Sequence, residues 1–131
     1  MKLLLLTVLA LGVLGVTGST QAADKKAKKQ SGRLRHVVCF KYNDGTPKKK
    51  IEEISRAFRA LKTKIAGIVA FEMGENNSPE GLNRGFTHCY QVTFGSEEAR
   101  EKYLPHPAHK AFVELLKPHL DEVFVIDYWA K

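Results

Sequence analysis

YLPHPAH, residues 103–109, is the stretch of sequence that decides the fold. Its two prolines interrupt a run that could otherwise be one helix. Pro105 cannot continue a helix, so the helix before it ends near Leu104. Pro107 suits the first position of a new helix, which Pro118 ends. The stretch therefore predicts two consecutive short helices.

A long helix and three strands are predicted before this stretch, and one more strand is predicted after it. Residues 86–94, FTHCYQVTF, alternate apolar and polar side chains, which is the period of a strand with one buried face. Thr46 offers an N-cap hydroxyl before Pro47, and apolar residues then follow at steps of three and four as far as Ile65. The other predicted elements are strands at 34–42, 68–73 and 123–129, a surface loop at 74–85 and a short helix beginning at Ser96.

The order of these elements is that of the ferredoxin-like βαββαβ arrangement. This α+β fold has a four-stranded antiparallel sheet with helices on one face. The first and third strands are expected to be central neighbours. The other face of such a sheet is bare in a monomer, and an exposed apolar patch of that kind usually marks an interface. The sequence therefore predicts a homodimer through the open sheet face. Candidate apolar side chains of that face are Val37, Val69, Phe71 and Met73.

The N-terminus has the pattern of a secretory signal peptide. Residues 1–22 give a short basic start, an apolar run at 3–16 and then small residues. The apolar run is shorter than the roughly 20 residues of a membrane helix. We therefore expect an exported protein, periplasmic or secreted, with no membrane span in the mature chain. A buried N-terminal helix is the alternative.

The positive charge is concentrated in a short segment after that leader. Residues 24–35 carry six Lys or Arg side chains against the single acidic Asp24, whereas residues 36–131 hold 14 against 13 Asp or Glu. Residues 23–33 are accordingly predicted to be a basic disordered linker, and residues 34–131 to be the folded domain. Nucleic acid is excluded as a partner because the leader points to export, but binding to an anionic surface remains open.

The segments LRHVVCFKY, GFTHCYQVTF, YLPHPAH and VIDY resemble those of the stress-responsive A/B barrel (Dabb) family. The resemblance covers about residues 34–129 and implies a dimeric α+β barrel. In a plant polyketide cyclase of this family, the tyrosine and the second histidine of the matching motif are the catalytic pair. That resemblance places the pair on Tyr103 and His109. It also implies that His36 and His88, on the first and third strands, line the same cavity as ligand-binding residues.

Proton transfer is the chemistry open to these side chains. His109 could take a proton from a carbon next to a carbonyl, while Tyr103 donates a hydrogen bond to the enolate oxygen. This would serve a cyclase, an isomerase or a lyase. No nucleotide-binding loop, flavin motif or nucleophile elbow is present, so no cofactor is predicted.

A metal site is not predicted either. The H-P-A-H pair has a spacing of three rather than the four of a zinc-protease helix, and no nearby carboxylate completes a ligand set. His106 is read as structural, either capping the following helix or reaching solvent.

The cysteines, Cys39 and Cys89, allow one disulfide at most. Both lie in predicted strands, on the face opposite to His36 and His88. If the two strands are parallel neighbours, disulfide geometry is poor. We therefore expect free thiols facing the dimer interface.

A structural or stress-protective oligomer without enzymatic activity is the main alternative function. In that case the histidines and the tyrosine only complete a polar core. A cavity of a few hundred Å³ beside Tyr103 and His109 would favour ligand binding, and a filled core there would favour the structural role.

Overall fold

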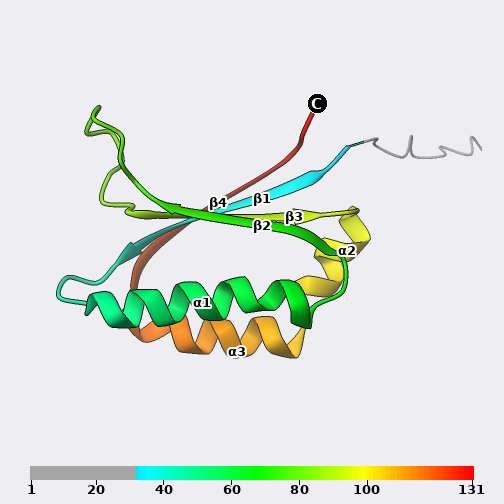
Figure 1. Ribbon diagram of the computed structural model, residues 1–131, viewed down its shortest axis with the longest axis horizontal. Coiled ribbons are helices and arrows are strands. Elements are labelled where there is room, and N and C mark those ends of the chain that lie inside the picture. The colour runs from blue at the N-terminus through cyan, green and yellow to red at the C-terminus, as the bar shows by residue number, and fades with distance from the viewer. Residues whose placement is uncertain (1–31) are drawn as a thin grey trace, which may run out of the picture.

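The computed structural model describes residues 32–131 (Figure 1). The predicted signal peptide at 1–22 and most of the predicted linker at 23–33 lie outside the described residues. Within the described part, no helix is long and apolar enough to cross a membrane.

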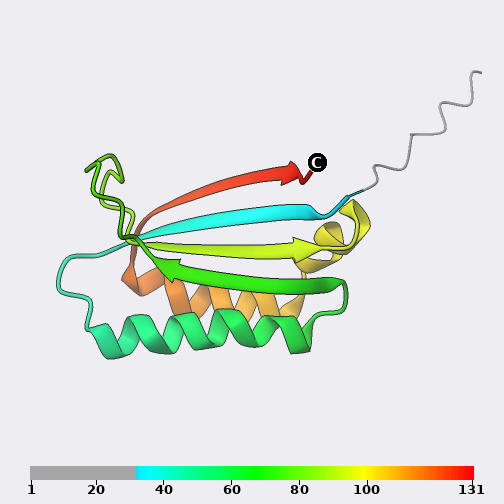
Figure 2. The same ribbon diagram turned by 45° about the horizontal axis from the view of Figure 1, so that its top comes forward.

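Four strands form one antiparallel sheet in the order β2-β3-β1-β4 (Figure 2). The long helix α1 and the helix α3 lie on one face of this sheet (Figure 1). This arrangement confirms the predicted ferredoxin-like α+β fold. The elements are β1 (Leu34–Tyr42), α1 (Lys48–Lys64), β2 (Ile68–Glu75), β3 (His88–Phe94), α2 (Glu97–Tyr103), α3 (Pro107–Leu116), the 3-10 turn η1 (Lys117–His119) and β4 (Leu120–Trp129).

The proline break between α2 and α3 is confirmed. Ser96 caps α2 by accepting a hydrogen bond from the backbone N–H of Ala99. His106 caps α3 by accepting, at Nδ1, the backbone N–H of Ala108, and Pro107 is the first residue of that helix. The structural role expected for His106 is therefore confirmed.

The start of α1 differs from the prediction by one residue. Pro47 is the N-cap, and no side chain caps this helix. The hydroxyl of Thr46 instead donates to the backbone carbonyl of Asn43, closing the turn after β1. The sequence pattern predicted that the Thr46 hydroxyl caps the helix, but this hydroxyl closes a local turn instead.

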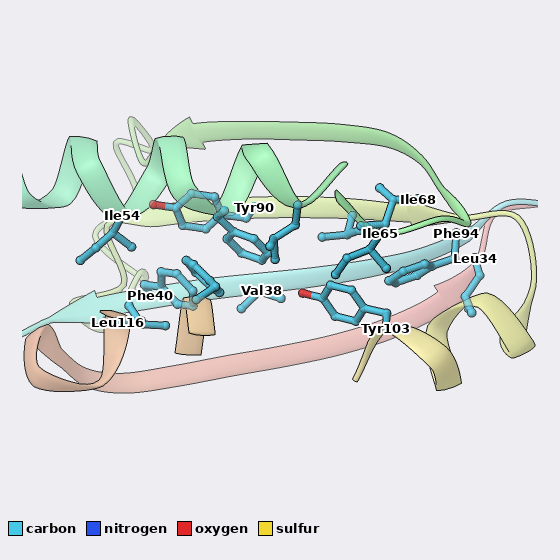
Figure 3. Close-up of a cluster of buried hydrophobic side chains, with 14 of the residues drawn as sticks. Leu34, Val38, Phe40, Ile54, Ile65, Ile68, Tyr90, Phe94, Tyr103 and Leu116 are labelled. Carbon is cyan, nitrogen blue, oxygen red and sulfur yellow. The ribbon is translucent and has the colours of Figure 1, made fainter. Parts of the chain in front are cut away.

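The core lies between the sheet and the helices, and aromatic and aliphatic side chains share it about equally (Figure 3). Side chains of β1 alternate between buried and half-buried along its whole length. The rings of Phe58 and Phe112, from α1 and α3, stack with centroids 4.4 Å apart. The ring centroids of Phe40 on β1 and Tyr90 on β3 are 4.9 Å apart. Packed rings of this kind bury large areas and hold the helices against the sheet.

The direction of β3 against β1 corrects one expectation. The strands are antiparallel, so Cys39 lies directly opposite Cys89, Phe40 opposite His88, and His36 opposite Val92. The assumption of parallel neighbours was wrong, and with it the geometric argument against a bond between the cysteines.

The open sheet face is also composed differently from the prediction. Phe71 lies opposite Val92 and Met73 opposite Tyr90, so both are on the helix side. An irregularity between Ile68 and Ala70 shifts the alternation of β2 by one residue. Val37 lies on the open face as predicted, opposite Ile126. The exposed apolar side chains that β4 adds to this face are Phe124, Ile126 and Tyr128.

Candidate functional site

The break between α2 and α3 brings Tyr103 and His109 together. Tyr103 is the last residue of α2 and His109 lies in the first turn of α3. Their ring centroids are 4.2 Å apart. The pair that the family resemblance implied is therefore in direct ring contact.

The hydrogen bond of His109 fixes its tautomer. Its Nδ1 lies 3.0 Å from the backbone carbonyl oxygen of Leu104, and a carbonyl can only accept, so Nδ1–H is the donor. Burial lowers the pKa of His109 below its ordinary value, and charge on His36 and His106 lowers it further, while the Leu104 carbonyl acts in the opposite direction. His109 is thus a neutral imidazole at pH 7 whose Nε2 can accept a proton.

The phenol of Tyr103 is buried and unpaired. The side chain is 0% exposed, and no hydrogen-bond partner for its hydroxyl lies among residues 32–131. Figure 3 shows the ring among Phe94, Ile65 and Val38. Burial raises the pKa of this phenol, so it stays protonated and can donate. An unpaired buried hydroxyl needs an explanation, and a ligand atom is one.

His36 belongs to the same cluster and is held by a hydrogen-bond network that the sequence did not predict. Its Nδ1 lies 2.7 Å from Oδ1 of Asp127 on β4, directly across the sheet. The other carboxylate oxygen accepts a 2.6 Å hydrogen bond from Arg100 of α2. The His36 ring meets Tyr103 edge-on at 5.9 Å. Asp127 thus orients the imidazole and ties β4 to α2.

His88 lies elsewhere. It is opposite Phe40, which is four residues from His36 on β1, or roughly 13 Å at strand spacing. Its ring contacts Tyr42 at 5.3 Å. The four predicted side chains therefore do not converge: His36, Tyr103 and His109 form one cluster, and His88 belongs to the other end of the sheet.

A cavity of about 590 Å³ opens at the His88 end, and we call it the His88 cavity. It lies between the first turns of α1 and the facing strands β2 and β3. The cavity does not reach Tyr103 or His109, and the core around Tyr103 is filled, which by the criterion given in the sequence analysis favours a structural role for that pair. The cavity is lined by Thr46, Lys48, Ile51, Glu52, Ser55, Arg56, Met73, Gly74, Glu75, His88 and Tyr90.

Hydroxyl groups form a hydrogen-bonded chain at the wall of this cavity. The hydroxyl of Tyr90 lies 2.7 Å from Ser55 Oγ and 3.0 Å from the Tyr42 hydroxyl. Burial lowers the pKa of the neighbouring His88, against the opposing charge of Glu75, so this imidazole is neutral at pH 7. The cavity therefore offers uncharged polar groups beside the apolar Ile51 and Met73.

Sequence reasoning missed the part played by Ser55 and Tyr90. Ser55 follows Ile54 on the apolar stripe of α1 and is buried with it. A hydroxyl at a buried helix position requires a partner, and this signal could have pointed to the site. Asp127 gave a similar signal, because it shares a strand face with Val123 and Val125.

Metal ligands do not gather at either site. Within residues 32–131, no group of three His, Cys, Asp or Glu side chains lies close enough together to hold an ion.

A ferredoxin-like antiparallel sheet with helices on one face, enclosing histidine and tyrosine side chains, places the chain among the small α+β domains of this architecture. Residues 34–130 match the model of the Stress responsive A/B Barrel Domain. The chain therefore belongs to that family, as the resemblance in its motifs implied.

Two curated relatives and one solved structure illustrate the similarity. The stress-response A/B barrel domain-containing protein HS1 of Arabidopsis thaliana is 39% identical over 97 residues, which are 74% of this chain and 89% of HS1. Olivetolic acid cyclase of Cannabis sativa is 25% identical over 95 residues, 72% of this chain and 94% of the cyclase. A dimeric ferredoxin-like protein of unknown function from Jannaschia sp. CCS1 superposes with a TM-score of 0.67 at 22% identity, covering 76% of this chain and 100% of that one.

Proposed function

We propose that this protein is an exported homodimer that binds a small, partly apolar molecule in the His88 cavity. The observation that carries the proposal is the cavity itself. Its volume of about 590 Å³ falls within the range of small-molecule sites, and its wall combines apolar side chains with a few hydrogen-bonding groups.

The lining defines the chemistry of the ligand. Ile51 and Met73 offer apolar contacts, while the Ser55–Tyr90 hydroxyl chain and the neutral His88 offer donors and acceptors. Charges of both signs line the cavity, since Lys48 and Arg56 are balanced by Glu52 and Glu75. An uncharged molecule with an apolar body and one or two oxygen atoms fits this wall best, for example a phenol or an aromatic ketone.

Thermal denaturation with a panel of phenols and aromatic ketones tests binding. We expect a subset to raise the melting temperature of the wild-type chain, and His88→Ala to lose that shift. His119→Ala is the matched control, because His119 lies outside the cavity lining and bonds to Asn43 only through its backbone carbonyl. The proposal fails if no compound stabilises the chain, or if both variants lose the shift equally.

A second candidate function is general acid/base catalysis at Tyr103 and His109, favoured by the unpaired phenol beside a neutral imidazole. Tyr103 would donate to a carbonyl oxygen while Nε2 of His109 takes a proton from the adjacent carbon. The similarity to a protein named as a cyclase, olivetolic acid cyclase, supports this chemistry. Because Tyr103 is fully buried, a substrate reaches its hydroxyl only after neighbouring side chains move.

Hydrogen–deuterium exchange at the carbon next to a ketone carbonyl measures this activity directly. The wild-type chain should accelerate exchange over buffer, with the acceleration lost in both Tyr103→Phe and His109→Gln. Exchange that is no faster than in buffer, or that survives both substitutions, contradicts the catalytic role while leaving binding in the His88 cavity intact.

The dimer and the export are part of the same proposal. The dimeric relative from Jannaschia and the apolar side chains exposed on β4 support self-association.

The composition of residues 1–22 supports export. A mature N-terminus at residue 23 or 24, found by mass spectrometry of the exported chain, is the expected result, and an intact residue 1 would contradict export.

A further inference from the structure

The His88 cavity has exposed charges and buried hydroxyl groups in its wall. Its buried hydroxyls belong to Ser55 and Tyr90, which are 6% and 1% exposed, and we call this inner end the floor of the cavity. A molecule inside therefore meets charges at the entrance and hydroxyl groups at the floor. The charged lining side chains are all exposed: Lys48, Glu52, Arg56 and Glu75.

The cavity lies on the helix side of the sheet. The start of α1 forms one wall, and Met73 of β2 and Tyr90 of β3, which are register partners, belong to the other. The proposed dimer uses the opposite, open face. Self-association through that face therefore does not cover the cavity.

The Ser55 hydroxyl is directed to the floor rather than to its own helix. A serine or threonine within a helix often donates to a backbone carbonyl one turn earlier, as Thr63 of α1 does to Ala60. The Ser55 Oγ instead lies 2.7 Å from the Tyr90 hydroxyl, which is beside α1 (Figure 3). Its partner within residues 32–131 is thus a second hydroxyl, which can accept a hydrogen bond as well as donate one.

The hydroxyl chain of Ser55, Tyr90 and Tyr42 has one more proton than it uses. Burial raises the pKa of both tyrosines, so all three hydroxyls keep their protons at pH 7. Two contacts join the three oxygen atoms, and each contact takes one proton. One O–H is therefore left without an acceptor among the residues that the structure describes, although each oxygen atom has a neighbour.

We propose that this unused O–H makes the His88 cavity selective for molecules with an uncharged oxygen acceptor, above all aromatic ketones and aldehydes, and that Ser55 and Tyr90 determine this specificity. The inference rests on the proposed binding function of the cavity and narrows its ligand class. A carbonyl oxygen fits because it has two lone pairs and no proton of its own.

Binding of a carbonyl compound gives every hydroxyl proton an acceptor. The Tyr42 hydroxyl donates to that of Tyr90, and either Tyr90 or Ser55 donates to the ligand oxygen. Because Tyr42 does not line the cavity, the O–H that the ligand receives comes from one of the two floor residues. A hydrocarbon of the same shape leaves one O–H unused, so the floor distinguishes the two molecules.

NMR titration with acetophenone and α-methylstyrene tests this selectivity, because α-methylstyrene has a CH₂ group in place of the carbonyl oxygen. Dissociation constants come from the amide shifts of the wild type and of the double variant Ser55→Ala/Tyr90→Phe. The double substitution should weaken acetophenone binding about fivefold, the value of one neutral hydrogen bond, and should not weaken α-methylstyrene binding. Thr63→Ala removes a hydroxyl of α1 outside the cavity lining and should change neither constant.

The carbonyl carbon of ¹³C-labelled acetophenone gives a second measurement on the wild type alone. This carbon resonates further downfield when its oxygen accepts a hydrogen bond, so the bound ketone should resonate downfield of its position in cyclohexane. A bound shift equal to that in cyclohexane, or an equal loss of affinity for both compounds in the double variant, overturns the selectivity and leaves binding in the cavity intact. Absence of acetophenone binding also overturns the selectivity. If no compound of the panel binds, the proposed binding function itself fails.

Discussion

Buried hydroxyl groups are of two kinds in this protein. Those of Tyr42, Tyr90 and Ser55 satisfy one another at the His88 cavity. That of Tyr103 is as deeply buried but has no partner among residues 32–131. Because a buried polar group costs free energy unless it is hydrogen-bonded, the second kind marks a site that a ligand could complete.

Replacing Tyr103 by Phe should raise stability rather than lower it. Removing an unsatisfied buried hydroxyl relieves a penalty of about 1–3 kcal/mol, so Tyr103→Phe should increase the free energy of unfolding by about 1 kcal/mol. Tyr42→Phe is the matched control. It removes a satisfied hydroxyl and should lower that free energy by about 1 kcal/mol. Urea unfolding measures both, and a loss of stability in Tyr103→Phe would show that its hydroxyl is already paired.

The position of a single residue could be predicted where the neighbouring sequence determines it. The break between α2 and α3 follows from two prolines within seven residues, which is local information, and the family resemblance implied the pairing of Tyr103 with His109 across it. The position of His88 relative to His36 depends on the direction and register of two strands far apart in sequence, and no local pattern gives either. The partner of Asp127 could not be predicted for the same reason, since it lies 91 positions away in the chain.

Among the elements, β4 is the strand with the most exposed apolar surface. It is an edge strand, and both its faces carry apolar side chains. Val123 on the helix side and Phe124 on the open side are 50% and 51% exposed. An edge strand with exposed apolar side chains needs protection from unspecific pairing, and the proposed dimer would provide it through the open face.

Phe124→Glu should therefore weaken the dimer, raising its dissociation constant at least tenfold, because a charge would be buried in the interface. Val123→Glu makes the same change at equal exposure on the opposite face and should leave the dissociation constant nearly unchanged. Sedimentation equilibrium of the two variants and the wild type decides the matter. Equal weakening by both would show that the open face is not the interface, and a monomeric wild type would exclude the dimer itself.

Element order was predictable, but the faces of one strand were not. Period-two alternation and proline positions located the strands and helices to within a few residues, because these patterns are local. The irregularity between Ile68 and Ala70 moved Phe71 and Met73 to the helix side. One extra residue moves every following side chain of the strand to the opposite face. No feature of the segment IVAFEM indicates this irregularity.

At the scale of the whole molecule, two neutral imidazoles link stability to pH. Burial lowers the pKa of both His88 and His109 below the ordinary value of 6.5. Between the folded and unfolded pKa values, the unfolded chain binds more protons than the folded one, so stability falls as pH decreases. Stability gained from keeping these rings neutral is complete above pH 6.5 and declines below it until the folded pKa is reached.

Urea unfolding at a series of pH values between about 8 and 5 should show this decline below neutrality. Each of His88→Gln and His109→Gln should reduce the slope, because each removes one group that takes up a proton on unfolding. A stability that is flat over this range, or a slope that neither substitution alters, would contradict the assignment of neutral rings.

The central claim is that the His88 cavity, rather than the Tyr103–His109 cluster, takes the ligand. Amide chemical shifts of the labelled chain, recorded by NMR during titration with the most stabilising compound of the panel, test it directly. The account predicts shift changes concentrated at Ser55, His88 and Tyr90. Changes confined to Tyr103 and His109, with the cavity residues unmoved, would contradict it.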